Sequence, residues 1–114
     1  MKRGDVFWAD LVPRSGSEQA GRRPVVIVSD DGFNLNRRWQ SVNLVPITTS
    51  RSQSNQDTTV EIPAGVAGLQ QTSFALCHQV TTLDKARVAT WIGTLPPAIL
   101  AELSVGIIAA LDLD

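Results

Sequence analysis

This 114-residue sequence has few of the side chains that build familiar catalytic and metal-binding sites. Cys77 is its one cysteine, so no disulfide can form within the chain and no zinc site can be built from clustered cysteines. His78 is its one histidine, which excludes a two-histidine acid–base pair within one chain. The motifs G-x-x-x-x-G-K-[ST], HExxH and CxxC are absent. A reducing compartment is expected, and any catalysis must depend on other groups.

Long apolar segments are missing too. The N-terminus, MKRGDVFWAD, reaches Asp5 without an apolar signal region. The apolar C-terminal stretch is short and is interrupted by Pro96, Pro97 and Glu102, so it is not expected to span a membrane. We therefore expect a cytoplasmic protein with no membrane partner. The length and the 43% hydrophobic content fit a single folded domain over residues 1–114.

The charge is unevenly distributed along the chain, although the formal net charge is only −1. Residues 1–51 carry eight basic and five acidic residues, whereas residues 52–114 carry two basic and six acidic residues. A basic half can bind an anionic ligand even when the whole chain is nearly neutral. Basic residues scattered over a solvated surface would give the same count. Charge alone does not decide between these interpretations.

Short β-branched and apolar runs, bounded by Gly, Pro, Asn and Asp, predict a mainly β chain. The run at 23–29 is continuously apolar after its proline, which predicts burial of both faces of that strand. Polar loops are expected over 11–22 and 49–57, and turns over 30–38 and 63–68. The strands are expected over residues 5–10, 23–29, 42–48, 58–62, 73–82 and 86–92.

The C-terminal segment has helical spacing instead. Its apolar stripe runs through Leu100, Leu103, Ile107 and Leu111. Pro97 suits the first helical position. Gly106 destabilises the helix interior by about 1 kcal/mol relative to Ala, so packing against other elements must stabilise the helix. The stripe could cover the barrel or a partner chain. One helix after five or six short strands predicts a small antiparallel barrel or sheet closed by a C-terminal helix.

The single cysteine, the single histidine and the three tryptophans are each candidates for a functional or a core position. Cys77 and His78 are neighbours in a predicted strand, so their side chains should point to opposite faces and should not form a catalytic couple. Cys77 is expected to be buried. Trp8 and Trp91 lie within predicted strands and are expected in the core, whereas Trp39 could be core or a base-stacking platform.

The loop GSEQAGRRP, residues 16–24, could hold an anion. Arg23 lies where this loop enters a strand, and a guanidinium can donate two parallel hydrogen bonds to a phosphate. A surface arginine paired to Glu18 is the plainer interpretation, and residue chemistry alone leaves both open. Arg22 should face the other way. Thr48, at the end of the third predicted strand, could equally be an ordinary β-former.

Six segments follow one another along almost the whole chain: KRGDVFWADL, GSEQAGRRPVVIVS, VPITTS, TTVEIPA, CHQVTTLDKARV, and IGTL followed by the helix. In this order they resemble the MazF/PemK/Kid family of toxins from toxin–antitoxin modules. The resemblance implies an SH3-like small β-barrel with a C-terminal α-helix, a homodimer and a cognate antitoxin. It also implies sequence-specific cleavage of single-stranded RNA without a metal or other cofactor.

The resemblance also implies roles for individual residues. Arg23, before the proline that opens its strand, and Thr48, after the aliphatic residue that ends its strand, match the catalytic positions. His78 stands where relatives commonly carry an acid, so the recognised RNA sequence should differ, because a neutral imidazole offers one donor and one acceptor. The implied RNA-binding residues are Ser17, Glu18, Gln19, Thr49, Ser50, His78 and Gln79.

On this hypothesis the 2′-hydroxyl of the RNA attacks the adjacent phosphorus, Arg23 stabilises the phosphorane oxygens, and Thr48 holds the phosphate or the 2′-hydroxyl. The general base stays open among Glu18, Arg23 and His78. Two alternatives are a non-catalytic toxin that binds DNA gyrase, as CcdB does on the same fold, and an inactive homologue that binds the antitoxin. CcdB uses aromatic residues at the end of its helix, whereas this chain ends in Leu-Asp-Leu-Asp, which favours the nuclease.

Overall fold

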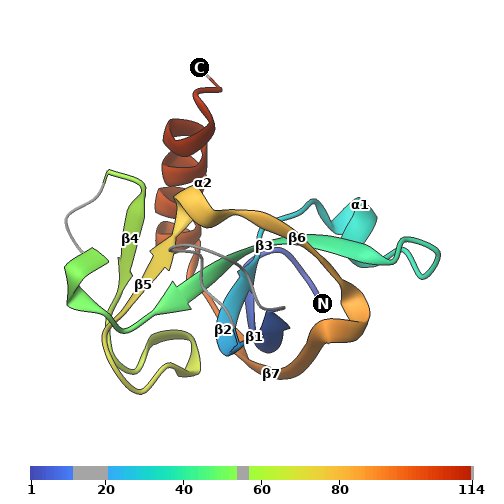
Figure 1. The fold of residues 1–114 in the computed structure, drawn as a ribbon, viewed down its shortest axis with the longest axis horizontal. Coiled ribbons are helices and arrows are strands. Elements are labelled where there is room, and N and C mark those ends of the chain that lie inside the picture. Colours follow the sequence, from blue (N-terminus) through green and yellow to red (C-terminus); the bar gives the residue numbers. More distant parts are fainter. Residues whose placement is uncertain (12–20, 54–56, 114) are drawn as a thin grey trace.

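The computed structural model describes residues 1–11, 21–53 and 57–113 (Figure 1). The strands are β1 (Asp5–Leu11), β2 (Gly21–Ile27), β3 (Ser41–Thr48), β4 (Thr59–Ile62), β5 (Ser73–Leu76), β6 (Thr81–Asp84) and β7 (Val88–Thr94). The α-helices are α1 (Asp31–Asn34) and α2 (Pro97–Leu111). Single 3₁₀ turns are η1 (Arg51–Gln53), η2 (Val66–Gly68), η3 (Cys77–Gln79) and η4 (Lys85–Arg87).

The strands form one antiparallel sheet in the order β4-β5-β3-β2-β1-β7, and β6 pairs with β3. Helix α2 packs against β4 and η3, and its C-terminal end projects beyond the sheet (Figure 1). The predicted mainly β fold, a small antiparallel barrel with a C-terminal helix, is confirmed. Within the described part of the chain, neither α-helix is long and apolar enough to cross a membrane.

Side chains of β2 enter two separate cores. Val26 belongs to the core that Leu103 of α2 completes, whereas Val25 and Ile27 belong to the second core, with Ala9 of β1. The three β2 side chains are fully buried. Burial on both faces of β2 therefore explains its continuous apolar run, as predicted.

The prediction of one long strand over 73–82 is wrong, because η3 divides this segment into β5 and β6. Both strands pair with the same edge of β3: Ile47 pairs with Ala75, and Leu44 pairs with Thr81. Between these pairs β3 has only two residues, Val45 and Pro46, whereas the opposite segment has five, 76–80. The additional residues of that segment form η3. Pro46 lies opposite this break and has no N–H to donate to a ladder. The interruption coincides with a missing backbone donor on the neighbouring strand.

Helix α2 begins at Pro97, as predicted, and seats Leu103 in the core. Gly106 packs against η3: a Cβ added there would lie 2.7 Å from Cys77 Sγ and 3.6 Å from a methyl carbon of Val60. Close packing thus explains the glycine that local propensity disfavours. Leu111, at the end of the predicted stripe, is 49% exposed, so the barrel does not cover the whole stripe.

The expectation that Trp8 and Trp91 lie in the core is wrong, because their exposed fractions are 36% and 58%. Val6 and Ala9 occupy the buried positions of β1 instead. Trp39 is also exposed and packs against Phe33, with ring centroids 4.9 Å apart. Aromatic residues favour strands, but this preference does not state which face of the strand the rest of the protein covers.

Candidate functional site

Arg23 and Thr48 lie on neighbouring strands, β2 and β3. The two strands pair from Val25 opposite Pro46 to Ile27 opposite Leu44, so Arg23 lies two residues before this paired stretch on β2 and Thr48 two residues after it on β3. Because the strands are antiparallel, both residues lie at the same end of the paired stretch. On its other side Arg23 pairs with Ala9, a small buried residue. Arg23 is thus carried by a strand that pairs with both β1 and β3.

Thr48 is 7% exposed and forms the last residue of β3. Its Oγ1 accepts a hydrogen bond from the backbone N–H of Ser50 at 3.1 Å, which holds the chain as it leaves the strand. This bond uses an oxygen lone pair and leaves the hydroxyl proton for another acceptor. Ser50 Oγ in turn lies 2.8 Å from Ser52 Oγ. Exposed hydroxyls of Thr49 and Ser50 therefore extend the site from Thr48.

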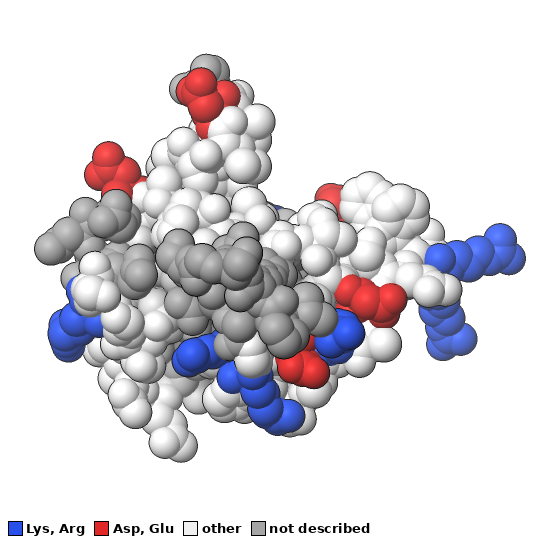
Figure 2. All heavy atoms as spheres, in the orientation of Figure 1, with Lys and Arg blue, Asp and Glu red and all other residues white. Residues whose placement is uncertain are grey.

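Basic side chains gather at this end of the protein. Arg22 and Arg23 are exposed on β2, and Arg51 is exposed on η1, just after Ser50. In Figure 2 basic side chains lie along the lower part of the molecule with acidic side chains among them, and further acidic side chains lie near the projecting end of α2. The guanidinium of Arg22 lies 5.4 Å from the centre of the Trp8 ring, and Trp8 pairs with Pro24. Arg22 thus contacts the Trp8 ring, whereas Arg23 lies at the same end of the β2–β3 pairing as Thr48.

His78 and Gln79 approach β3 from the edge opposite to β2. They lie in η3, the bulge opposite Val45 and Pro46, two residues along β3 from Thr48. His78 is exposed, and its Nδ1 lies 3.3 Å from Thr58 Oγ1. The Gln79 side-chain nitrogen lies 3.5 Å from His78 Nε2. Thr48, Thr49 and Ser50 thus lie at the end of β3, while Arg23 on β2 and His78 and Gln79 on η3 belong to the elements on the two edges of β3.

Ser17, Glu18 and Gln19, the remaining predicted RNA-binding residues, lie outside the described residues. Their expected roles therefore stay predictions. The loop that contains them joins β1 to β2, the strand of Arg23.

Cys77 and His78 are separated, as predicted, although η3 and not a continuous strand separates them. Cys77 is fully buried, with Sγ 3.7 Å from the carbonyl oxygen of Leu103, whereas His78 faces solvent. Burial raises the pKa of the Cys77 thiol to about 11, so the thiolate is scarce at neutral pH. The residues that the structure describes contain no group of three or more His, Cys, Asp and Glu side chains arranged for a metal ion.

Sequence reasoning did not single out Gln70 and Gln71. These exposed residues line a cavity beside the site with Trp8, which had been expected in the core. The two adjacent amides after Gly68 were the available sequence signal, since a glycine-containing turn can hold neighbouring polar side chains at a fixed place. Their relation to Trp8 depends on contacts between distant strands, which the local sequence does not contain.

Comparison with known proteins identifies the family of this chain. Residues 2–111 match the family described as the PemK-like, MazF-like toxin of type II toxin-antitoxin systems. Endoribonuclease MazF6 of Mycobacterium tuberculosis is 31% identical over 113 residues, covering 99% of this chain and 98% of that protein. Endoribonuclease MazF of Staphylococcus epidermidis is 35% identical over 114 residues, covering 100% of this chain and 93% of that protein.

Solved structures give the same result. An endoribonuclease from a mycobacterial species, solved with its cognate antitoxin, has a TM-score of 0.81 and 26% identity, covering 100% of this chain and 97% of that one. Mycobacterium tuberculosis toxin MazF-mt6 has a TM-score of 0.78 and 27% identity, covering 96% and 98%. The chain belongs to the PemK-like, MazF-like toxin family of type II toxin–antitoxin systems.

Proposed function

We propose that this protein is a sequence-specific endoribonuclease that cuts single-stranded RNA, including messenger RNA, without a metal. The observation that carries this proposal is the antiparallel pairing of β2 with β3, which places Arg23 and Thr48 at the same end of the paired stretch. The names of the relatives, endoribonucleases over nearly their full length, support it. A guanidinium next to a threonine hydroxyl offers several hydrogen-bond donors to one phosphate group.

The proposed reaction takes its nucleophile from the RNA. The 2′-hydroxyl oxygen forms a bond to the adjacent phosphorus as the bond from phosphorus to the 5′ oxygen breaks. The 2′ proton passes to a general base, and the leaving 5′ oxygen gains a proton, which yields a 2′,3′-cyclic phosphate and a 5′-hydroxyl. Arg23 stabilises the charge on the phosphorane oxygens, a role that contributes about 3–4 kcal/mol per donor in comparable sites. The Thr48 hydroxyl donates a hydrogen bond to the phosphate or orients the 2′-hydroxyl by hydrogen bonding.

Three groups are candidates for the proton transfers: Glu18, Arg23 and His78. His78 is held by Thr58 on the bulge opposite Pro46, so it approaches the site from the side away from Arg23. An RNA strand crossing the end of β3 would meet the exposed Thr49 and Ser50 between them. Single-stranded RNA suits such a surface, because its bases are free to turn toward hydroxyls and amides. Ser17, Gln19 and Gln79 complete the proposed contact set.

We further propose a homodimer, neutralised by a cognate antitoxin in the cytoplasm, where messenger RNA is translated. The mycobacterial endoribonuclease of similar fold was solved with its antitoxin, which supports the second partner. Exposed Val105, Ile108 and Leu111 on the C-terminal half of α2 support self-association, since an apolar helix face is favoured against another protein surface. Light scattering after size-exclusion chromatography tests the dimer, which a monomer mass at micromolar protein would exclude.

The test of the nuclease is cleavage of a mixed-sequence RNA in EDTA, followed by sequencing of the product 5′ ends. Discrete cuts are expected, and the RNA word read from them is used to make an oligonucleotide with 2′-deoxyribose at the cut position. That oligonucleotide should stay intact, because its nucleophile has been removed. Cleavage of the deoxy substrate would exclude attack by the 2′-hydroxyl. Absence of any RNA cleavage would leave a gyrase-binding or antitoxin-binding role.

A further inference from the structure

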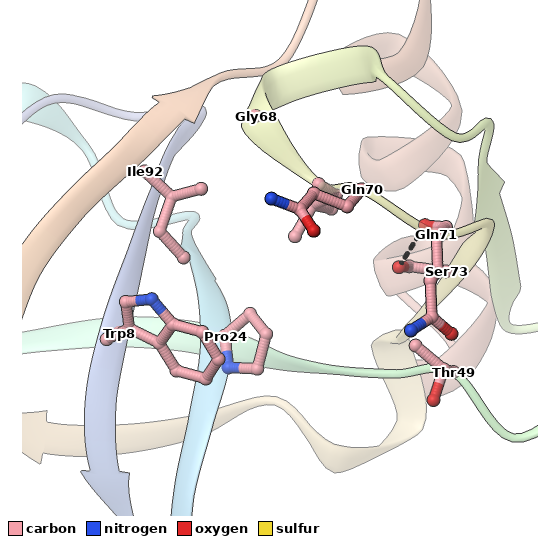
Figure 3. Close-up of a pocket in the computed structure, with 9 residues that line it drawn as sticks. Trp8, Pro24, Thr49, Gly68, Gln70, Gln71, Ser73 and Ile92 are labelled. Atoms are coloured by element: carbon pink, nitrogen blue, oxygen red, sulfur yellow. Dashed lines mark hydrogen bonds between the residues drawn. The ribbon is translucent and has the colours of Figure 1, made fainter.

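A cavity of about 370 Å³ lies at the same end of β2 and β3 as Arg23 and Thr48, and Figure 3 shows the residues that line it. Pro24 and Thr49 line it, and they directly follow Arg23 and Thr48 in the chain. Successive side chains of a strand point to opposite faces. A single RNA strand that passes over the strand ends could therefore reach both the catalytic pair and the cavity.

One wall of the cavity is apolar. Trp8 of β1 and Pro24 of β2 are register partners, and Ile92 of β7 lies on the same side in Figure 3. An aromatic ring that is 36% exposed at the wall of a cavity offers a stacking surface for a planar ligand. Leu69, at the base of the adjoining loop, is nearly buried and adds apolar lining.

The opposite wall carries amides. Gln70 and Gln71 are exposed and extend from the loop across the cavity from Trp8 (Figure 3). Ser73 Oγ donates a hydrogen bond to the Gln71 carbonyl oxygen at 2.8 Å, which holds the loop at one end. Gly68, at φ +75°, holds the other end, because a Cβ there would lie 2.4 Å from the Ile92 carbonyl oxygen. A wall fixed at both ends needs little ordering when it binds a ligand.

The lining chemistry selects the ligand. None of the described residues that line the cavity is charged, so it suits a neutral group better than a phosphate. Each carboxamide offers both donors and an acceptor, the pattern needed to pair with the edge of a nucleobase. Arg22, with its guanidinium 5.4 Å from the Trp8 ring, supplies positive charge next to the cavity for a flanking phosphate.

We propose that this cavity binds one unstacked nucleobase of the RNA, next to the scissile phosphate, with Trp8 stacking on the base and Gln70 and Gln71 contacting its edge. The proposal rests on the ribonuclease function proposed above and assigns a specificity site to it. Double-stranded RNA is disfavoured at this site, because a paired base must first be unpaired and unstacked, which costs free energy.

The test is an abasic scan of the uncleavable 2′-deoxy oligonucleotide, with dissociation constants measured by fluorescence anisotropy in EDTA. Removing one base, next to the scissile phosphate, should weaken binding to the natural protein roughly tenfold, the order that base–aromatic stacking contributes. Removing the same base should hardly change the dissociation constant of Trp8→Leu, because this variant lacks the stacking ring. In Trp8→Phe, which keeps an aromatic ring, removing the base should still weaken binding. Equal losses for the natural protein and Trp8→Leu at every position would overturn the proposal.

Trp91→Leu is the matched control, because Trp91 adjoins Ile92 on β7 but its side chain points to the other face. It should keep the full abasic effect. If circular dichroism shows that Trp8→Leu does not fold, Gln70→Ala and Gln71→Ala carry the same test. These exposed substitutions should abolish discrimination among bases at that one position, and unchanged discrimination would overturn the proposal.

Two further outcomes separate this inference from the proposed function. If the natural protein cuts RNA but Trp8→Leu does not change the effect of removing any base, the proposed function stands and the nucleobase site is overturned. A natural protein that cuts no RNA overturns both proposals. Trp8→Leu could instead lose antitoxin binding while every base removal weakens RNA binding equally in the natural protein and the variant. That result would overturn the proposal that the cavity binds a nucleobase and would assign the cavity to the antitoxin.

Discussion

Gly106 of α2 lies directly against Cys77 of η3, since a Cβ at position 106 would come within 2.7 Å of Cys77 Sγ. The contact fixes the helix on the bulge that also carries His78 and Gln79. A glycine that lowers helix stability locally therefore allows η3 and the middle of α2 to pack closely.

Gly106→Ala should lower the free energy of unfolding by up to about 2 kcal/mol. Overpacking typically costs about 1–3 kcal/mol, and the gain in helix propensity offsets about 1 kcal/mol of this cost. Urea unfolding followed by circular dichroism measures the change. The same substitution should cost less in a Cys77→Ala background, which removes the sulfur atom. An increase in stability from Gly106→Ala alone would contradict the close contact.

Arg23→Ala should reduce kcat/KM for RNA cleavage by about 10²–10³-fold, the effect of losing one well-placed donor to a developing oxyanion. Arg23→Lys should recover only part, because an ammonium lacks the two-pronged geometry of a guanidinium. Arg22→Ala is the matched control on the adjacent residue and should change kcat/KM by less than tenfold. Thermal melts should show that all three variants fold, since both arginines are exposed. Normal turnover by folded Arg23→Ala would remove Arg23 from the catalytic assignment.

Thr48→Val keeps the shape of the side chain and removes its hydroxyl. We expect at least a tenfold loss of kcat, together with a loss of about 1 kcal/mol in unfolding free energy, because the Ser50 N–H loses its acceptor. Thr48→Ser restores the hydroxyl and should recover most of the activity. Single-turnover cleavage and urea unfolding distinguish the two effects. Equal activity of the Val and Ser variants would show that Thr48 acts through packing alone.

Asp31 should contribute a pH-dependent part of the stability. Its carboxylate accepts hydrogen bonds from the Arg3 backbone N–H at 2.7 Å and from the Asn34 side chain at 3.0 Å, which lower its pKa below the usual 3.8. A lowered folded-state pKa stabilises the protein above pH 3.8, and this contribution falls as the pH drops through 3.8 toward the folded-state value.

The measurement is the urea midpoint of the natural protein and of Asp31→Asn at pH 7 and pH 3. The natural protein should be more stable than the variant at pH 7, and the difference should shrink at pH 3. A difference independent of pH would mean that the hydrogen bonds of Asp31 do not depend on its charge.

Much of the local structure was predictable from local pattern. The apolar run of β2 indicated burial on two faces, and the spacing of Leu100, Leu103 and Ile107 indicated α2, because strand and helix periods leave different spacings along the chain. The resemblance of ordered motifs, and not the chemistry of single residues, separated Arg23 from Arg22 and singled out Thr48. Residue chemistry alone had left Arg23 open between a phosphate ligand and a surface ion pair.

The tertiary structure decided what local pattern could not. The segment 73–82 is apolar enough for one strand, but it breaks opposite Pro46, a residue some thirty positions earlier that lacks a backbone donor. Trp8 and Trp91 have strand propensity, yet the covering elements leave both exposed, and Trp8 meets Gln70 and Gln71 across a cavity. Register and burial are set by contacts between residues far apart in the chain, whereas propensity and periodicity act among neighbours. The sequence by itself therefore determined most of the elements, and the pairing of those elements decided where segment 73–82 breaks and where Arg23, Thr48 and the cavity lie.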